Sequence, residues 1–92
     1  MTLSQYRSLP PELKIAWRFI KADYKVIRGF MRRGGEFRGE LLIHADYLRR
    51  EAALLESIPE NATESERALL SLRYRETFGR VPIENAAYPR AL

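Results

Sequence analysis

The sequence predicts an all-α fold: a three-helix up-down-up antiparallel bundle with a long basic first helix and an extended C-terminal arm. Apolar residues recur at alternating spacings of three and four along most of the chain, which is the period of one helical face. Gly and Pro number only five each, too few for the frequent turns of an all-β fold. A chain of 92 residues has room for one core and about three helices, which short loops join most simply in antiparallel order.

The first predicted helix begins at tandem prolines and ends at tandem glycines. Pro10 and Pro11 favour a helix start, and Gly34 and Gly35 can adopt the left-handed conformation that caps many helices. Two apolar stripes run along this helix, and together they predict that it is packed on two sides. The first stripe consists of Leu13, Trp17, Ile20, Tyr24, Ile27 and Met31, and the second of Ile15, Phe19, Val26 and Phe30.

A second helix is predicted over residues 36–58 and a third over residues 63–79. Pro59 closes the second helix, and Thr63 with Glu66 has the spacing of a capping box for the third. The second helix has one apolar face, which consists of Phe37, Leu41, Ala45, Leu48, Ala52 and Leu55. The apolar positions of the third are Ala68, Leu69, Leu72 and Phe78.

The bundle is predicted to occupy residues 1–79 and the arm residues 80–92. The arm contains two prolines and lacks helical periodicity, which predicts an extended conformation. An arm with large apolar side chains on so small a domain is either disordered or laid along a partner. The arm residues that we expect to contact a partner are Val81, Ile83, Tyr88 and Leu92.

The net charge of +4 is unevenly distributed along the chain. Residues 1–35 carry eight Lys or Arg against two acids, whereas residues 36–92 carry eight Arg against ten acids. Cations of the first helix repeat the four-three spacing one position after the first apolar stripe, with no acid among them to pair at i+4. We call this row the basic ridge; it consists of Lys14, Arg18, Lys21, Lys25, Arg28 and Arg32.

Two interpretations of the basic ridge are open. It is either a solvated face whose charges pair with acids of the second and third helices, or a docking surface for phosphate on RNA or on a phosphorylated protein. Aromatic residues alternate with the cations, as on some nucleic-acid surfaces, but their position on the opposite arc of the helix favours the core. These aromatic residues are Trp17, Phe19, Tyr24 and Phe30.

No catalytic, metal or cofactor site is expected, and we therefore do not expect an enzyme. The chain has no cysteine, and it contains no phosphate-binding loop, metal-ligand spacing or nucleophilic set that stands out. Asp23 lies in the apolar arc and is expected to have a polar partner, while the single histidine, His44, is expected to be a packed structural residue. No apolar run is long enough to predict a membrane span.

Two segments of the first third resemble a known family. A Leu-Pro-Pro-acid-Leu sequence begins the helix, and a Lys, an acid, an aromatic and a basic residue follow a bulky pair. This pattern resembles the LYR proteins, small three-helix mitochondrial proteins, and within them the succinate dehydrogenase assembly factor branch. The tripeptide that names the family is not intact here, and Gln5-Tyr6-Arg7 resembles it only in a shifted position. The residues that carry the resemblance are Leu9, Pro10 and Pro11, then Lys21, Asp23, Tyr24 and Lys25.

The resemblance implies a location in the mitochondrial matrix, or on the matrix side of the inner membrane, and no enzymatic activity. It implies an assembly factor or accessory subunit of a respiratory complex, whose partners are subunits of that large complex. Acyl carrier protein is a further candidate partner, because several members bind it through basic residues. The alternative hypothesis is a basic, RNA-contacting accessory subunit of the mitochondrial ribosome.

Overall fold

The computed structural model of the chain describes residues 1–35 and 38–78, and these residues form four helices and no strand. The helices are α1 (Leu3–Ser8), α2 (Pro11–Arg33), α3 (Arg38–Glu56) and α4 (Glu64–Phe78). The predicted all-α class is confirmed. The short helix α1 was not predicted, because six residues are too few to display a helical period.

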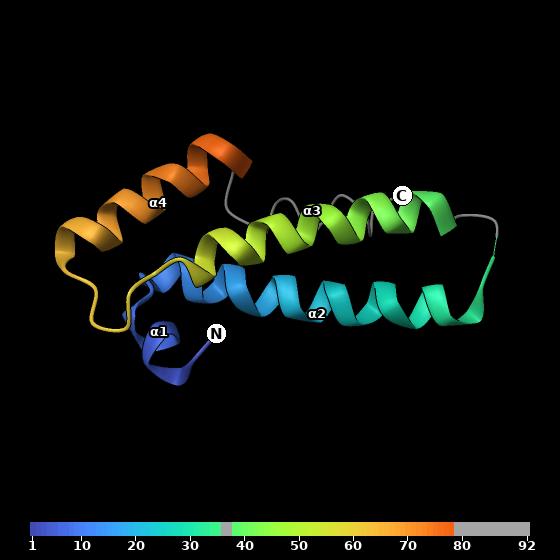
Figure 1. Ribbon diagram of the computed structural model, residues 1–92, viewed down its shortest axis with the longest axis horizontal. Coiled ribbons are helices and arrows are strands. Elements are labelled where there is room, and N and C mark those ends of the chain that lie inside the picture. The colour runs from blue at the N-terminus through green and yellow to red at the C-terminus, as the bar shows by residue number, and fades with distance from the viewer. Residues whose placement is uncertain (36–37, 79–92) are drawn as a thin grey trace.

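The helices α2 and α3 form an antiparallel hairpin and pack along their length (Figure 1). The helix α4 is inclined to this hairpin and packs chiefly against α3 rather than α2. One long side of α2 therefore has no helix against it in the described part of the chain.

The ends of α2 lie where the sequence predicts. Pro11 is its first residue, and Gly34 and Gly35 follow its last turn with φ angles of 73° and 135°. The ψ of Gly34 is −174°, so this glycine occupies the mirror-extended region that only glycine adopts readily, rather than the left-handed helical region that was predicted.

The first apolar stripe of α2 lies in the core, whereas most of the second does not. Leu13, Ile20 and Ile27 are 2%, 3% and 6% exposed. Val26 and Phe30 are 54% and 50% exposed. The prediction that α2 is packed on two sides is therefore wrong for most of the second stripe, because α3 covers one side and α4 packs against α3 instead. The buried core consists of Leu9, Leu13, Ala16, Ile20, Ile27, Ala45, Leu48, Leu55, Ile58, Leu70, Tyr74 and Phe78.

The third predicted helix forms as α4, but it buries a different face from the one expected. The capping box is confirmed, since Thr63 Oγ1 accepts from the Glu66 amide at 3.1 Å and Glu66 Oε1 accepts from the Thr63 amide at 2.9 Å. Of the four apolar residues expected on this helix only Phe78 is buried, and Leu69 and Leu72 are exposed. The register against α3 instead buries Leu70 and Tyr74.

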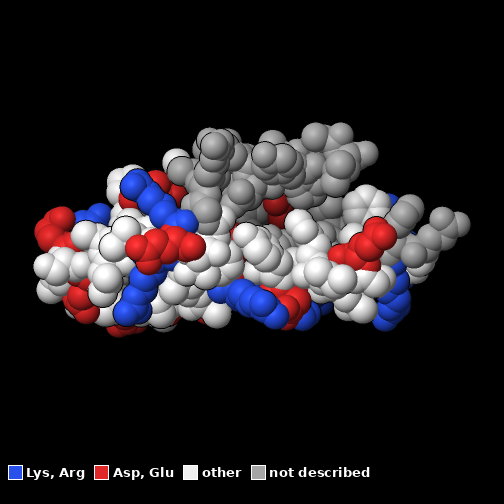
Figure 2. All heavy atoms as spheres, turned by 90° about the horizontal axis from the view of Figure 1, so that it is seen from above, with Lys and Arg blue, Asp and Glu red and all other residues white. Residues whose placement is uncertain are grey.

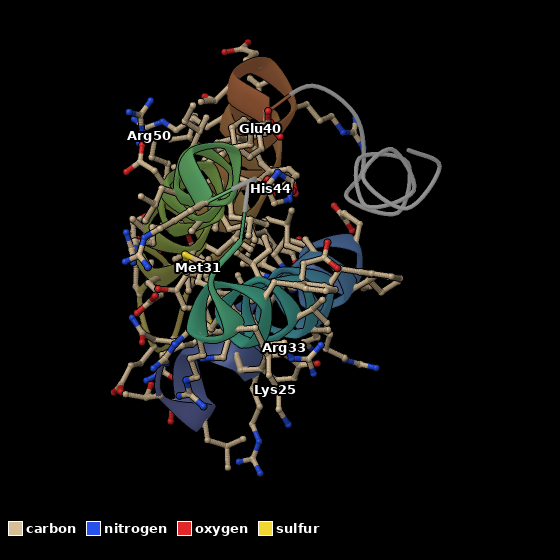
Figure 3. The ribbon with its side chains drawn as sticks, turned by 90° about the vertical axis from the view of Figure 1, so that its right-hand side faces the viewer. Lys25, Met31, Arg33, Glu40, His44 and Arg50 are labelled. Carbon is tan, nitrogen blue, oxygen red and sulfur yellow. The ribbon has the colours of Figure 1, made fainter. Side chains whose placement is uncertain are left out.

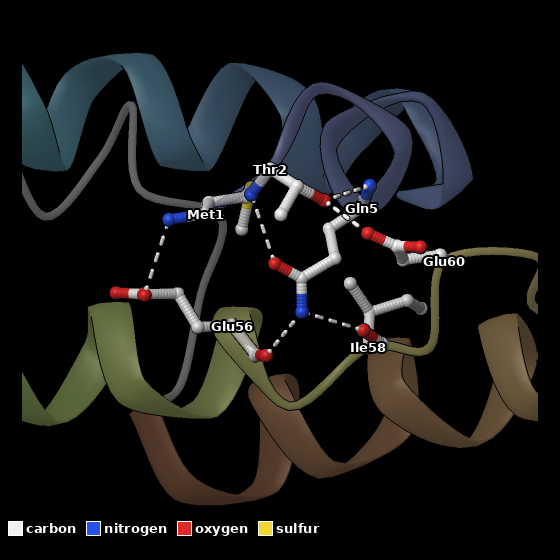
Figure 4. Close-up of polar contacts among 6 residues, drawn as sticks. All are labelled: Met1, Thr2, Gln5, Glu56, Ile58 and Glu60. Carbon is white, nitrogen blue, oxygen red and sulfur yellow. Dashed lines mark hydrogen bonds and ion pairs between the residues drawn. The ribbon is translucent and has the colours of Figure 1, made fainter.

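The helix α1 fastens the N-terminal segment to the end of α3 (Figure 4). Thr2 and Gln5 form a capping box at its start. The Gln5 Nε2 group donates to the carbonyl oxygens of Glu56 at 2.9 Å and Ile58 at 3.0 Å, which satisfies acceptors at the C-terminal end of α3. Ser8 Oγ donates to the Glu60 carbonyl, so both ends of α1 hold the loop between α3 and α4.

Some predicted residues lie outside the described residues. These are Phe37 of the second predicted helix, the expected stop at Gly79 and the arm with Val81, Ile83, Tyr88 and Leu92. Within the described ranges, no helix is long and apolar enough to cross a membrane, and no three His, Asp or Glu side chains gather to hold a metal ion.

Candidate docking surface

The basic ridge runs along the side of α2 next to its buried stripe. Five of its six residues are exposed, and Lys14 is half-buried. At 1.5 Å per residue the ridge extends over about 27 Å of the helix axis. Figure 3 looks along the helices and shows Lys25 projecting from α2 away from α3, whereas Met31 points toward α3. The ridge therefore faces outward from the hairpin.

The cations of the ridge form no ion pair with the other described helices. The ion pairs that the described residues form are Arg50 with Asp46, Arg67 with Glu64, and the Met1 amino group with Glu56. No ridge residue belongs to them, so the interpretation of a face paired with acids of α3 and α4 is wrong for this part of the chain. By contrast, the surface seen from the side of α3 and α4 has basic and acidic groups interspersed (Figure 2).

Several ridge cations lie over aromatic rings instead of beside acids. Lys21 Nζ lies 5.5 Å from the centre of the Trp17 ring, and the Arg28 guanidinium lies 6.0 Å from that of Tyr24. A cation over an aromatic face is weakly attracted to it and keeps its full charge. The ridge thus remains positively charged although its side chains are held in place.

Tyr6 of α1 and Arg49 of α3 also belong to this surface, although the periodicity of α2 cannot predict either of them. Arg18 Nε donates to the hydroxyl of Tyr6 from α1 at 2.7 Å, and the Lys14 Nζ lies 5.9 Å from the centre of the same ring. On the opposite side, Arg49 of α3 donates to the Tyr24 hydroxyl at 2.9 and 3.1 Å. The positive surface therefore includes Arg49, which only the packing of α3 on α2 brings there.

A hollow of about 670 Å³ opens on the outer face of α2, between the long cationic side chains. Its depth comes from two small residues, Ala22 and Gly29, which lie seven positions apart and so point in nearly the same direction. We call the line between them the small-residue seam. The lining of the hollow consists of Lys21, Ala22, Tyr24, Lys25, Arg28, Gly29 and Arg32.

The fold does not require a glycine at position 29. Its φ is not positive, and a Cβ added there would have no heavy atom within 4 Å beyond its chain neighbours and the adjoining backbone of its own helix. Glycine inside a helix costs about 1 kcal/mol relative to alanine. Gly29 therefore lowers the stability of the isolated chain, and no contact among the described residues compensates for this loss.

The far side of the seam is apolar. Ile15, Val26 and Phe30 are 38%, 54% and 50% exposed, and the Arg33 guanidinium lies 5.6 Å from the centre of the Phe30 ring. Large apolar side chains in a row on one exposed helix face are typical of an interaction surface. The outer face of α2 thus has three parallel strips: basic ridge, small-residue seam and apolar strip.

A buried carboxyl lies inside the bundle, apart from this surface. Glu51 is 2% exposed, and its Oε2 accepts a hydrogen bond of 2.7 Å from the Tyr74 hydroxyl. Burial raises the pKa of Glu51, the bond from Tyr74 opposes this rise, and the nearby charge of Asp23 adds to it. Burial also raises the pKa of Tyr74, as does its bond to Glu51.

This pair has the features of a structural contact, because its two polar groups satisfy each other in the interior. Asp23 and His44 are both half-buried, so neither is exposed on the outer face of α2.

The residues that carry the family resemblance are divided between core and surface. Leu9 and Pro10 are buried at the start of α2, and Pro11 is exposed. Tyr24 packs against the core, while Lys21 and Lys25 belong to the ridge. Comparison of the chain with protein-family models, with curated proteins and with solved structures finds no match.

Proposed function

We propose that this chain is a non-enzymatic LYR-type mitochondrial protein that acts through protein–protein contacts as an assembly factor or accessory subunit of a respiratory-chain complex. The observation that carries the proposal is the row of ridge cations that form no ion pair with any described acid. Like charges held in a row repel one another, and an anionic partner would remove this cost. We propose that the three long helices of this chain form an up-down-up bundle, in which the first long helix presents this row at its surface.

The family pattern supports the choice of complex. The Leu-Pro-Pro start and the cluster of Lys21, Asp23, Tyr24 and Lys25 resemble the succinate dehydrogenase assembly factor branch. We propose the matrix, or the matrix side of the inner membrane, as the location. Acyl carrier protein is a second proposed partner, since its acidic surface is complementary to the ridge.

RNA binding is the alternative, because ridge cations at helical spacing suit phosphates as well as carboxylates. One observation disfavours it. The rings of Tyr6, Trp17 and Tyr24 have cations over them, and single-stranded RNA is bound largely by bases stacking on open aromatic faces. We therefore place a protein partner first.

The test is quantitative co-purification from mitochondria of cells that express a tagged copy. We expect respiratory subunits, acyl carrier protein or both to be enriched over a tagged control, and to be lost when Lys25 and Arg28 are both replaced by Glu. A matched double variant, with Arg73 and Arg75 of α4 replaced by Glu, has the same change in charge and should retain them. Recovery of neither partner by the wild-type protein would overturn the proposal, and recovery of ribosomal RNA instead would favour the alternative.

A further inference from the structure

We propose that the outer face of α2 binds an acidic amphipathic helix of a partner protein, packed along the small-residue seam. This inference rests on the proposed function and names the chemistry of the partner at that site. It follows from the order of the three strips, from the row of cations without ion pairs to described acids and from the glycine that the fold does not need.

The order of the strips defines what a partner must present. Cations lie on one side of the seam, and Val26 and Phe30 lie on the other, both half exposed. A partner centred on the seam meets positive charge along one flank and apolar surface along the other. A helix with acids on one flank and apolar residues on the other satisfies both at once.

The seam determines how closely that helix can approach. Helix axes usually lie about 8–10 Å apart, and the distance depends on the side chains at the contact. At Ala22 and Gly29 the side chains are smallest, and the space above Gly29 is open. Close approach there would bring the partner's acids within reach of Lys21, Lys25 and Arg28 without bending α2.

The length of the surface gives the length of the partner segment. The hollow extends from Lys21 to Arg32, which at 1.5 Å per residue corresponds to about 16 Å. A partner helix of about three turns covers it. This is the length of an ordinary helix in a globular protein, so no special architecture is needed on the other side.

Two other classes of partner fit less well. RNA has no use for the apolar strip, and the aromatic rings on which its bases would stack have cations over them. A lipid surface favours an apolar face that sinks between the headgroups with cations around it. Here the ridge cations lie on one side of the apolar strip only.

The test uses the whole chain and a defined probe. The probe is a helix-stabilised peptide of about 16 residues with Glu along one flank, Ala along the middle and Leu along the other. A peptide of the same composition in permuted order is its control, and an RNA oligonucleotide and anionic vesicles are tested in parallel. Affinity is measured by fluorescence anisotropy for the wild type and for the variants Gly29→Leu, Lys25→Glu and Arg73→Glu.

We expect the amphipathic peptide to bind at least about tenfold more tightly than the permuted one. Gly29→Leu fills the seam and leaves every charge in place, so it should weaken binding about tenfold or more while the chain stays folded, since a Cβ added there meets open space. Lys25→Glu should weaken binding similarly, and Arg73→Glu on α4 should not.

Equal affinity for the two peptides, or unchanged binding by Gly29→Leu, would overturn the inference. Tighter binding of RNA or vesicles that Gly29→Leu leaves intact would also overturn it and assign the ridge to phosphate. The proposed function is tested separately by co-purification. If Gly29→Leu retains its respiratory partners as well as the wild type does, the inference that a partner packs along the seam is contradicted and the proposed function is retained. If the wild type recovers none, the proposed function fails whatever the peptide does.

Discussion

The inner and outer faces of α2 have the same helical period and opposite physical properties. The inner face buries Leu13, Ile20 and Ile27 against α3, and its residues are the ones that a folded hairpin needs. The outer face has like charges in a row, an interior glycine and half-exposed Val26 and Phe30. Each of these is neutral or unfavourable for the isolated chain. The inner face therefore accounts for folding, and the outer face is best explained by something that the chain binds.

The largest effect should come from the inner face. Replacing the buried Leu13 by Ala removes apolar contacts and leaves a cavity in the core, which should lower the free energy of unfolding by about 2–5 kcal/mol. The matched change on the outer face is Ile15→Ala, which should cost much less because Ile15 is 38% exposed. Urea denaturation measures both. Equal losses would mean that the two faces do not differ as described.

The next effect should come from the buried polar pair. Tyr74→Phe removes the donor of the 2.7 Å bond to Glu51 and leaves a carboxyl in the interior without it. We expect a loss of about 1–3 kcal/mol at neutral pH, because a buried acceptor without its partner pays its desolvation cost. Thermal denaturation measures the loss. A neutral result would show that the Tyr74 hydroxyl does not support Glu51 in the folded chain.

Glu51 itself should make stability depend on pH. Its pKa is raised in the folded chain, chiefly by burial, so the protonated form is favoured there. The stabilisation is complete below the pKa of the unfolded chain and is lost as the pH rises through the higher pKa of the folded one.

Glu51→Gln should therefore gain stability over the wild type at about pH 8 and lose that gain at about pH 4. The measurement is the free energy of unfolding of both proteins across that range. A pH-independent difference between them would contradict the raised pKa.

A smaller effect of opposite sign is expected on the outer face. Gly29→Ala should raise the free energy of unfolding of the isolated chain by about 0.5–1 kcal/mol, since a methyl group meets nothing there and alanine is the better helix former. Thermal denaturation measures the gain. Destabilisation would mean that the fold needs this glycine, and it would remove one of the observations from which the docking site is inferred.

The smallest effect is expected from the ridge. Replacing Lys25 and Arg28 by Gln should change the free energy of unfolding by less than about 0.5 kcal/mol, because neither side chain forms an ion pair with a described residue. Added salt should stabilise the wild type slightly more than this variant by screening the repulsion. A large loss of stability would show that the ridge holds the bundle together.

Local signals in the sequence predict where the helices begin and end, but they do not predict how the helices pack against one another. Proline, glycine and capping-box signals place both ends of α2 and the start of α4 almost to the residue. The buried face of α4 was mispredicted because this helix has apolar residues on opposite sides. Whether Leu70 or Leu69 is buried is decided by how α3 meets it. The signal for α1 was present in Thr2 and Gln5, a capping box without a long helix behind it.

The sequence likewise predicts only part of the candidate surface. All six ridge cations follow from the period of α2, but the contribution of Arg49 depends on tertiary packing and has no signal in its own helix. The seam could have been read from the sequence, since Ala22 and Gly29 lie seven apart on the side opposite the buried stripe. Its interpretation as a contact site needs the structure, because only the structure shows that the space above Gly29 is open.

The chain's three lysines, Lys14, Lys21 and Lys25, all lie on the ridge and can report whether the outer face of α2 is covered by a partner. Their reactivity toward an amine-modifying reagent should be compared by mass spectrometry in the isolated chain and in the complex recovered from mitochondria. If the outer face of α2 is the docking surface, Lys21 and Lys25 should react freely in the isolated chain and be protected in the complex. The half-buried Lys14 should change least. Equal reactivity of Lys21 and Lys25 in both states would contradict the claim.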